Sequence, residues 1–354
     1  MTAWRIRAVL LPGGETAEAG ITEAGTWTSR PAAGAETLPG RFVLPGLVDA
    51  HCHLGIGQSA DGPVALGMDA VRANLARARQ AGVTAIRDTG SPGSLTLRVL
   101  AAGDGAGLQA SGRFLAPEGQ YFPGLHVPVP PEELIAAALA EVRAGAAWVK
   151  LIADFPVLTP GQPPTEPRPT YPLAEIRRLT EAVHRAGARV AAHSTTSRVT
   201  ELIDAGIDSV EHGTGLDEAG VDALAARGGA WTPTLCAVFA PRPDDDPARQ
   251  RVRAELRERL SYLLPRAAER GVTIMTGTDV VGSLPREVAL LAELGLPPRR
   301  ALAAASSAAR DFLGFAGLSD GEPADLVTYH GDPREDPAVL GHPAAIFTRG
   351  ARIT

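Results

Sequence analysis

The sequence of 354 residues contains little cysteine and almost no lysine. Its two cysteines, Cys52 and Cys236, lie far apart in apolar surroundings, which favours reduced, buried thiols over a disulfide framework. Among the 34 basic residues, Lys150 is the single lysine, and the others are arginines. Because arginine supplies the cations everywhere else, surface charge does not explain why a lysine occurs at this position.

Long apolar runs are also missing from the chain. No run reaches the roughly 18 residues that a membrane span needs, and the early "AVLL" is too short for a signal-peptide core. The net charge of −6 lacks the basic footprint of a nucleic-acid-binding protein. We therefore expect a cytoplasmic protein that acts on a small molecule and binds neither nucleic acid nor membrane. Self-association into a homo-oligomer stays open.

The chain does contain a regular alternation of short β-branched segments and longer helical patterns, which indicates βα units with parallel strands. Most of the helical patterns end in glycine, as helix C-termini often do. Eight such units over about 275 residues predict a (β/α)8 TIM barrel spanning residues 45–319. The expected strands are 46–53, 83–90, 108–117, 148–154, 189–195, 208–214, 230–236 and 272–279.

The two ends of the chain have a different pattern. Residues 1–44 and 320–354 predict short strands and turns, which we expect to pair into one small β-sandwich domain beside the barrel. Two proline-rich stretches, 118–131 and 155–172, follow the third and fourth strands. Long loops in a compact domain are usually functional, and after barrel strands they would overhang the active-site face.

The stretch "VLPGLVDAHCHL" places His51 and His53 at the end of the first barrel strand. Residues i and i+2 of a strand point the same way, so both imidazoles can face the barrel axis and converge on one ion. Taken alone, the pair could equally be two hydrogen-bonded core histidines.

Three further side chains favour the metal interpretation. His193, His212 and Asp279 end the fifth, sixth and eighth expected strands, where barrel enzymes build their sites. Imidazole with some carboxylate suits a borderline metal such as Zn²⁺, and a catalytic site keeps one position open for water. Mn²⁺ or Fe²⁺ would also fit this set of ligands.

Lys150, at the end of the fourth strand, suggests how a second ion could be held. A lysine amine in an apolar setting has a lowered pKa, and the free amine can add CO₂ to form a carbamate that bridges two cations. Arginine cannot do this because it keeps its proton. The alternative is a buried lysine paired with Asp154 or Glu211.

Together, "PGLVDAHCH", Lys150, "AAHS", "VEHG", "GTD" and the tail "GEPADLV" resemble the amidohydrolase superfamily over nearly the whole chain. The pattern is most similar to the two-metal branch with a carboxylated lysine, which includes prolidase-like dipeptidases. The resemblance implies a barrel with a small β domain from both termini. It also implies that His51, His53 and Asp279 bind one ion, that His193 and His212 bind the other, and that carboxylated Lys150 bridges them.

This arrangement predicts a hydrolase that cleaves a C–N (amide) bond in a dipeptide, an N-acyl amino acid or a cyclic amide. A hydroxide that bridges the ions would attack the carbonyl, and Asp279 would act as general base and then general acid. One alternative is a single-metal deaminase or imidazolonepropionase-like ring hydrolase. Hydrolysis of lactones, esters or carbamates also stays open, as does a barrel that has lost catalysis, although no ligand is missing from the pattern.

Weaker candidates surround this set. Tyr121 and His126 lie in the long loop after the third strand and could contact the substrate, or they could be ordinary loop residues. Arg286 could pair with a substrate carboxylate or be an ordinary cation at a helix start. We expect Asp88 and Thr89, at the end of the second strand, to support the metal site through hydrogen bonds.

Overall fold

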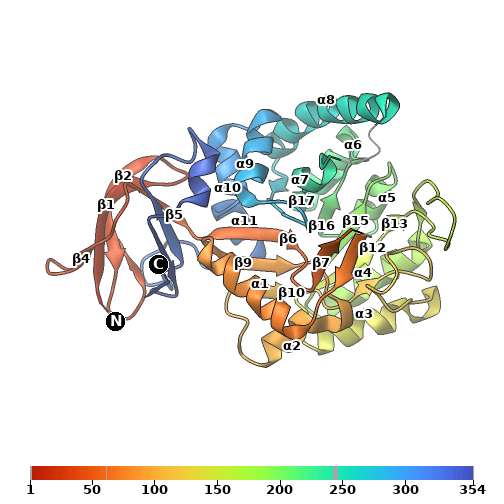
Figure 1. Ribbon diagram of the computed structural model, residues 1–354, viewed down its shortest axis with the longest axis horizontal. Coiled ribbons are helices and arrows are strands. Elements are labelled where there is room, and N and C mark those ends of the chain that lie inside the picture. Colours follow the sequence, from red (N-terminus) through yellow and green to blue (C-terminus); the bar gives the residue numbers. More distant parts are fainter. Residues whose placement is uncertain (1, 61, 242–245, 354) are drawn as a thin grey trace.

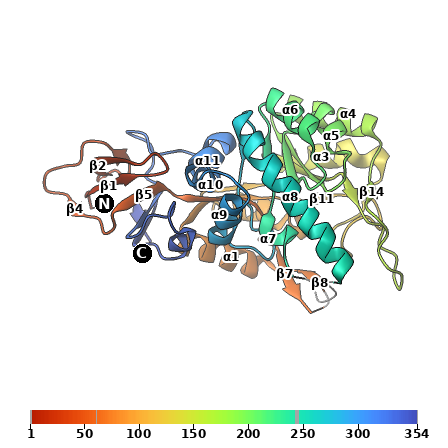
Figure 2. The same cartoon turned by 90° about the horizontal axis from the view of Figure 1, so that it is seen from above.

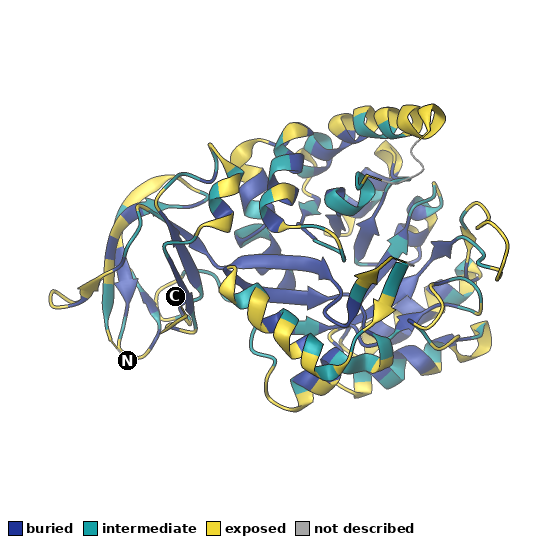
Figure 3. Ribbon diagram, in the orientation of Figure 1, coloured by how far each residue is buried: buried dark blue, intermediate teal, exposed yellow. Residues whose placement is uncertain are grey.

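The computed structural model describes residues 2–60, 62–241 and 246–353. Residues 1 and 354, the outer limits of the predicted terminal domain, lie outside this range. Figure 1 shows two parts, a sheet that contains both chain ends and a larger α/β part. In Figure 3 the strands at the centre of the larger part are buried, whereas its helices expose their outer faces. The helix Leu173–Arg185, for example, buries Ile176, Leu179 and Val183 along one stripe.

The larger part contains parallel strands in two sheets. One sheet has the order β10-β9-β6, and the other has the order β11-β12-β15-β16-β17-β18. Backbone hydrogen bonds join the outer members of the two sheets, from Ala50 N to Thr276 O at 2.9 Å and from Asp279 N to His51 O at 2.8 Å. The strands are β6 (Leu47–Cys52), β9 (Val83–Asp88), β10 (Leu108–Ala110), β11 (Phe114–Leu115), β12 (Trp148–Ile152), β15 (Arg189–Ser194), β16 (Ser209–His212), β17 (Ala230–Thr232) and β18 (Thr273–Ile274).

Three expected strands are much shorter than the sequence pattern predicts. The segment 230–236 is a strand only at Ala230–Thr232, and its last two residues begin the helix Leu235–Val238. The segment 108–117 is divided into β10, which pairs with β9, and β11, which pairs with β12. Gly112 lies between them with a φ of +73°, and a Cβ there would meet the Glu141 carboxylate at 2.2 Å, so the chain turns where an extended strand was expected. The segment 272–279 is a strand only at Thr273–Ile274, and the rest continues in irregular conformation.

Helices cover the outside of these strands, and Figure 2 shows α8 crossing over the assembly. Asp246 caps α8 by accepting hydrogen bonds from the backbone N–H groups of Ala248 and Arg249. The α-helices are α1 (Met68–Gln80), α2 (Leu95–Ala101), α3 (Leu134–Arg143), α4 (Leu173–Arg185), α5 (Val199–Asp204), α6 (Glu218–Ala226), α7 (Leu235–Val238), α8 (Pro247–Glu269), α9 (Leu284–Glu293), α10 (Pro298–Ala304) and α11 (Ser307–Leu313). Among the described residues, none of these helices is long and apolar enough to cross a membrane.

The two chain ends share one sheet with the order β21-β20-β19-β5-β1-β2-β3, and β4 pairs with β1. The sheet joins the ends because β19 runs antiparallel to β5, with Leu326 opposite Pro45. Its strands are β1 (Trp4–Leu10), β2 (Glu15–Ile21), β3 (Trp27–Thr28), β4 (Glu36–Thr37), β5 (Phe42–Pro45), β19 (Leu326–Tyr329), β20 (Ala345–Thr348) and β21 (Ala351–Arg352). Gly46 directly connects β5 to β6, so the terminal sheet leads straight into the larger part.

Two short hairpins add to the larger part, β7 (Ile56–Ser59) with β8 (Gly62–Ala65) and β13 (Asp154–Phe155) with β14 (Arg168–Pro169). The second hairpin belongs to the proline-rich stretch after β12. Side chains from both hairpins and from the loop after β11 meet in one apolar cluster, which contains Ile56, Phe114, Ala116, Tyr121, Leu125, Ile152 and Phe155. The proline-rich loops therefore cover the ends of the strands with an apolar layer.

Candidate metal centre

The ends of β6, β12, β15 and β16 bring the predicted ligands together with Asp279, which follows β18. The ring centroids of His51 and His53 lie 5.2 Å apart, those of His51 and His212 lie 4.9 Å apart, and those of His193 and His212 lie 4.5 Å apart. Ligand atoms of His51, His53 and Asp279 all lie within 4.8 Å of one another. Side chains distant in the sequence thus meet in one small volume.

Hydrogen bonds orient three of the imidazoles. His51 donates from Nδ1 to Glu211 Oε2 at 2.6 Å, and His53 donates from Nδ1 to the carbonyl of Gly90 at 2.9 Å. The Nδ1 of His212 lies 2.6 Å from Thr234 Oγ1. Because each Nδ1 is engaged, the lone pair is on Nε2, the arrangement that metal-binding histidines usually show.

Glu211 connects His51 to a buried arginine. Its Oε1 accepts hydrogen bonds from Arg87 Nη2 at 2.7 Å and from Ser209 Oγ at 2.6 Å. Arg87 is fully buried and lies over the ring of Trp148, 4.5 Å from its centroid. The Arg87 guanidinium and the Glu211 carboxylate form a charge-assisted hydrogen bond, which fixes Glu211 as the partner of His51.

Burial keeps the four imidazoles neutral. It lowers the pKa of His53 to about 3 and that of His193 to about 4, and it holds the pKa values of His51 and His212 well below the ordinary value. Nearby positive charge, chiefly from Lys150, adds to the effect for His51 and His53. A neutral imidazole is the form that can bind a metal, so near neutral pH these four side chains are in the protonation state that a metal site requires.

Lys150 is 1% exposed, and burial lowers its pKa to about 8. Its Nζ and the Nε2 of His51 have no hydrogen-bond partner among the described residues. Asp154 accepts hydrogen bonds from Ser194, Thr195 and Thr196. Glu211 accepts hydrogen bonds from His51, Arg87 and Ser209. Lys150 therefore forms no ion pair with Asp154 or with Glu211.

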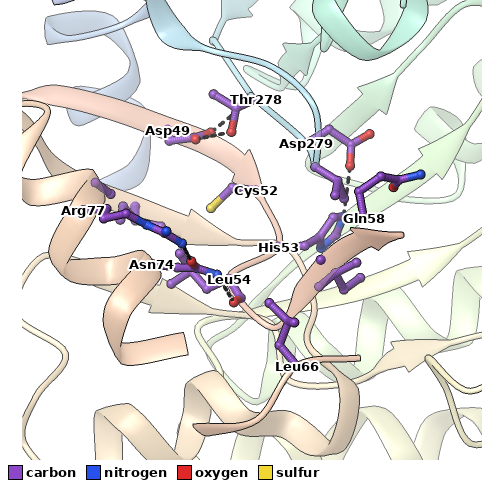
Figure 4. Close-up of a pocket in the computed structure, with 15 residues that line it drawn as sticks. Asp49, Cys52, His53, Leu54, Gln58, Leu66, Asn74, Arg77, Thr278 and Asp279 are labelled. Atoms are coloured by element: carbon purple, nitrogen blue, oxygen red, sulfur yellow. Dashed lines mark hydrogen bonds and ion pairs between the residues drawn. The ribbon is translucent and has the colours of Figure 1, made fainter. Parts of the chain in front are cut away.

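Asp279 closes the site from the strand β18 side. Its φ of +54° is in the left-handed region, and its backbone N–H is bonded to His51 O. The carboxylate lies 3.6 Å from His53 Nε2 and keeps 20% of its surface exposed, so a substrate can reach it. Burial raises its pKa to about 6. Figure 4 shows Asp279 and His53 facing one another across the site.

The unpartnered donor atoms, the neutral imidazoles and the carboxylate fit a site for divalent cations. Imidazole nitrogens and a carboxylate are the ligands that Zn²⁺ and similar ions prefer. An Nε2 and an amine buried without partners would otherwise cost the fold free energy. The donor set therefore accounts for polar atoms that the fold itself leaves unsatisfied.

A cavity of about 350 Å³ reaches His53 and Asp279 from the side of α1. Cys52 also lines it, but in Figure 4 its sulfur points away from His53. Burial raises the pKa of this thiol, so it stays protonated and is unsuited to binding metal. This agrees with the expectation that Cys52 packs in the core.

Asp88 and Thr89 hold the loops beside His53, as expected. Asp88 accepts hydrogen bonds from Leu54 N at 2.8 Å and from Gly90 N at 3.2 Å, and Thr89 Oγ1 donates to Cys52 O at 3.3 Å. The carbonyl of Gly90 in turn accepts from His53, so Asp88 fixes the group that orients this ligand.

The three predicted substrate contacts lie in different places. Tyr121 is buried in the apolar cluster, with its ring centroid 4.7 Å from that of Phe114, and His126 packs edge-on against it at 5.6 Å. Phe114 also lies 5.3 Å from His53. Arg286 lines a second cavity of about 760 Å³ between α7, α8 and α9, where it pairs with Glu293 at 2.5 Å.

Sequence reasoning missed the residues that orient the ligands. Glu211 entered it only as an alternative partner for Lys150, and Arg87 and Thr234 did not enter it at all. A carboxylate and an arginine inside apolar strands are a signal that could have identified the first two. Thr234 has no such signal because threonine is common in strands.

The chain is similar to several known proteins. A family model described as "Amidohydrolase family" matches residues 42–350. An uncharacterized protein of Mycobacterium tuberculosis (strain H37Rv) is 34% identical over 358 residues, covering 98% of this chain and 94% of the relative. The solved structure of a Xaa-Pro dipeptidase with bound methionine is similar with a TM-score of 0.80 at 22% identity, covering 99% of both chains. A prolidase complexed with N-methylphosphonate-L-proline has a TM-score of 0.79 at 23% identity, covering 100% of both chains.

Proposed function

Because the chain belongs to the amidohydrolase family, we propose that it hydrolyses the C–N bond of a small amide with the help of two divalent cations. The chain is a hydrolytic enzyme of mixed α/β fold, and the proposal concerns its metals, its catalytic residue and its substrate. The observation that carries it is the closeness of His51, His53, His193, His212 and Asp279, beside which Lys150 of β12 is buried with an unpartnered amine.

We assign one ion to His51, His53 and Asp279 and the other to His193 and His212. Support for the first comes from the closeness of its three ligand atoms, and support for the second from the 4.5 Å between its two rings. Lys150, which has a lowered pKa and an unpartnered amine, would carry the bridging carbamate. Zn²⁺ is the first choice for both ions, with Mn²⁺ or Fe²⁺ as substitutes.

The cations would supply Lewis-acid chemistry, which acidifies water and polarises the carbonyl of the substrate. Asp279 would take the proton of the attacking water and pass it to the leaving nitrogen. Its partial exposure leaves room for the leaving group.

We propose a dipeptide, an N-acyl amino acid or a cyclic amide as the substrate. The dipeptidase and the prolidase that share the fold act as precedents for the first class. The apolar cluster around Tyr121 and Phe114 would form a wall beside the scissile bond, with His126 at its edge. Arg286, in its own cavity, would receive a carboxylate of the substrate by releasing Glu293.

We propose that the parallel strands close into a (β/α)8 barrel, supported by the hydrogen bonds from Ala50 N and Asp279 N across to the neighbouring segment. We also propose that the terminal sheet curves into a β-sandwich. Its support is the apolar cluster that joins Ile6 and Ala19 of the N-terminal strands to Leu326 and Phe347 of the C-terminal strands.

A hydrolysis screen tests the proposed function. The metal-loaded protein is assayed against dipeptides, N-acyl amino acids, lactams and lactones, and Asp279→Asn serves as the control. We expect turnover of at least one amide class and a loss of about 10²- to 10⁴-fold in kcat for Asp279→Asn. Turnover that this substitution leaves unchanged refutes the role of Asp279. A wild-type chain that binds one ion and lacks a carbamate favours the single-metal ring hydrolase.

A further inference from the structure

The turn that carries His212 has a conformation that its own sequence disfavours. His212 has a φ of +64° and Gly213 has a φ of +63°, so two consecutive residues are in the left-handed region. Glycine adopts this region freely, but histidine does so at a cost and keeps it only when its surroundings impose it. The contacts that impose it here come from the neighbouring strand and from the helix beyond it.

Trp231, on β17, holds the backbone of this turn. Its indole Nε1–H donates to the carbonyl of His212 at 2.9 Å, and the ring is fully buried. A Cβ on Gly213 would lie 2.6 Å from that same nitrogen, so the indole also fills the space that a larger residue would need. The indole therefore fixes both the carbonyl direction of His212 and the identity of the next residue.

Thr234 holds the imidazole of the same residue. Its hydroxyl donates its one proton to the carbonyl of Pro233 at 2.8 Å. It must therefore accept the hydrogen bond from His212 Nδ1, which lies 2.6 Å away. This pattern places the proton on Nδ1 and leaves Nε2 free to bind an ion.

Thr234 is itself strained, with a φ of +46° that is unusual for a β-branched residue. Glu287, on α9, stabilises the turn that begins there. Its fully buried carboxylate accepts hydrogen bonds from Leu235 N at 3.1 Å and from Cys236 N, the first two residues of α7. Helix α7 packs against α9, as Figure 1 shows.

We infer that Glu287 is a positioning residue for the second metal ion, acting through Thr234 on His212. The chain of contacts runs from the α9 carboxylate to the α7 turn, from the turn to the threonine hydroxyl, and from the hydroxyl to the imidazole. The contacts of Glu287 and Thr234 lead to His212. Their loss is therefore expected to weaken binding of the ion at His193 and His212, and to leave binding of the ion at His51, His53 and Asp279 unchanged. The inference rests on the proposed two-metal function.

Metal retention tests this inference without an activity assay. Zinc-loaded wild type, Glu287→Gln and Thr234→Val are passed through a chelator at several concentrations, and bound zinc per chain is measured by mass spectrometry. The glutamine amide places an N–H group against one backbone donor, and valine keeps the β-branched shape but cannot accept from His212. We expect both variants to keep the ion at His51, His53 and Asp279 as tightly as the wild type does. They should lose the ion at His193 and His212 at a chelator concentration about 10- to 100-fold lower.

Matched controls separate positioning from a general loss of structure. Thr234→Ser restores the hydroxyl and should restore both ions, and Glu269→Gln, the same change on the exposed surface of α8, should leave both in place. If Glu287→Gln unfolds, which circular dichroism will show, Thr234→Val against the wild type still gives the comparison at almost constant volume, because valine and threonine have the same shape. Equal retention of both ions in Thr234→Val and Glu287→Gln overturns the inference alone. A wild-type chain that retains fewer than two ions overturns the proposed function together with it.

Discussion

Lys150 is the residue on which the two-metal proposal depends most. Burial lowers its pKa to about 8, so a much larger fraction of the amine is neutral near pH 8 than for an ordinary lysine. Since only the neutral amine adds CO₂, carbamate formation should increase as the pH rises from 7 to 9. ¹³C NMR with labelled bicarbonate should show a carbamate signal that Lys150→Met lacks. The absence of any difference between the two proteins would contradict the carbamate.

Lys150 should also lower the free energy of unfolding of the metal-free protein. The folded pKa of about 8 lies below the unfolded value of 10.5, so the unfolded chain holds more protons between these values. The cost is therefore complete below pH 8 and disappears as the pH rises to 10.5. We expect Lys150→Met to raise the free energy of unfolding of chelator-treated protein by about 3 kcal/mol at pH 7 and by much less at pH 10. Denaturant titrations at both pH values measure the difference, and a gain that grows with pH would show the sign to be wrong.

Glu211 should influence metal affinity through His51. Glu211→Gln keeps the shape of the side chain but removes the charge that balances Arg87 and weakens the acceptor for His51 Nδ1. We expect zinc affinity at the His51 site to fall about 10- to 100-fold. Isothermal titration against a competing chelator is a suitable measurement. Glu141→Gln serves as the comparison, because Glu141 pairs with Arg113 and not with the predicted metal ligands. This variant should bind zinc with the affinity of the wild type.

At the scale of elements, the sequence predicted the larger features and missed the irregular ones. The order of parallel strands and the positions of His51, His53, His193 and His212 at strand ends followed from periodicity, because buried strands carry continuous apolar runs. The break at Gly112 and the early end of β18 did not, because both depend on contacts with side chains far away in the sequence. The hairpin β7–β8 was also missed, since its short, polar segments lack a clear alternation.

The early end of β18 permits a close approach between two segments. Gly277 lies where a Cβ would meet His51 Cβ at 2.5 Å and Thr232 Cγ2 at 2.8 Å. Gly277→Ala should therefore push β6 away from the segment that carries Asp279, at a cost of about 1–3 kcal/mol. Denaturant unfolding measures this cost, with Gly34→Ala, where no atom lies within 4 Å of the added carbon and φ is not positive, as a steric comparison. Equal stability of wild type and Gly277→Ala would show that the approach is not tight.

At the scale of the whole molecule, Arg310 joins the terminal sheet to the larger part. It is fully buried, donates to Gly46 O at 2.7 Å and to Ala316 O at 2.6 Å, and lies 3.7 Å from Asp325. Arg310→Leu would leave two carbonyls and a carboxylate without this partner. We expect the free energy of unfolding to fall by about 3–5 kcal/mol. A thermal transition that the substitution does not shift would show that the two parts are held together by other contacts.

An anomalous difference map from crystals of the zinc-loaded protein is the most decisive test of a two-metal centre bridged by Lys150. We expect two peaks, one beside His51, His53 and Asp279 and one beside His193 and His212, with density for a carbamate on Lys150 between them. A single peak with a bare lysine amine would contradict it.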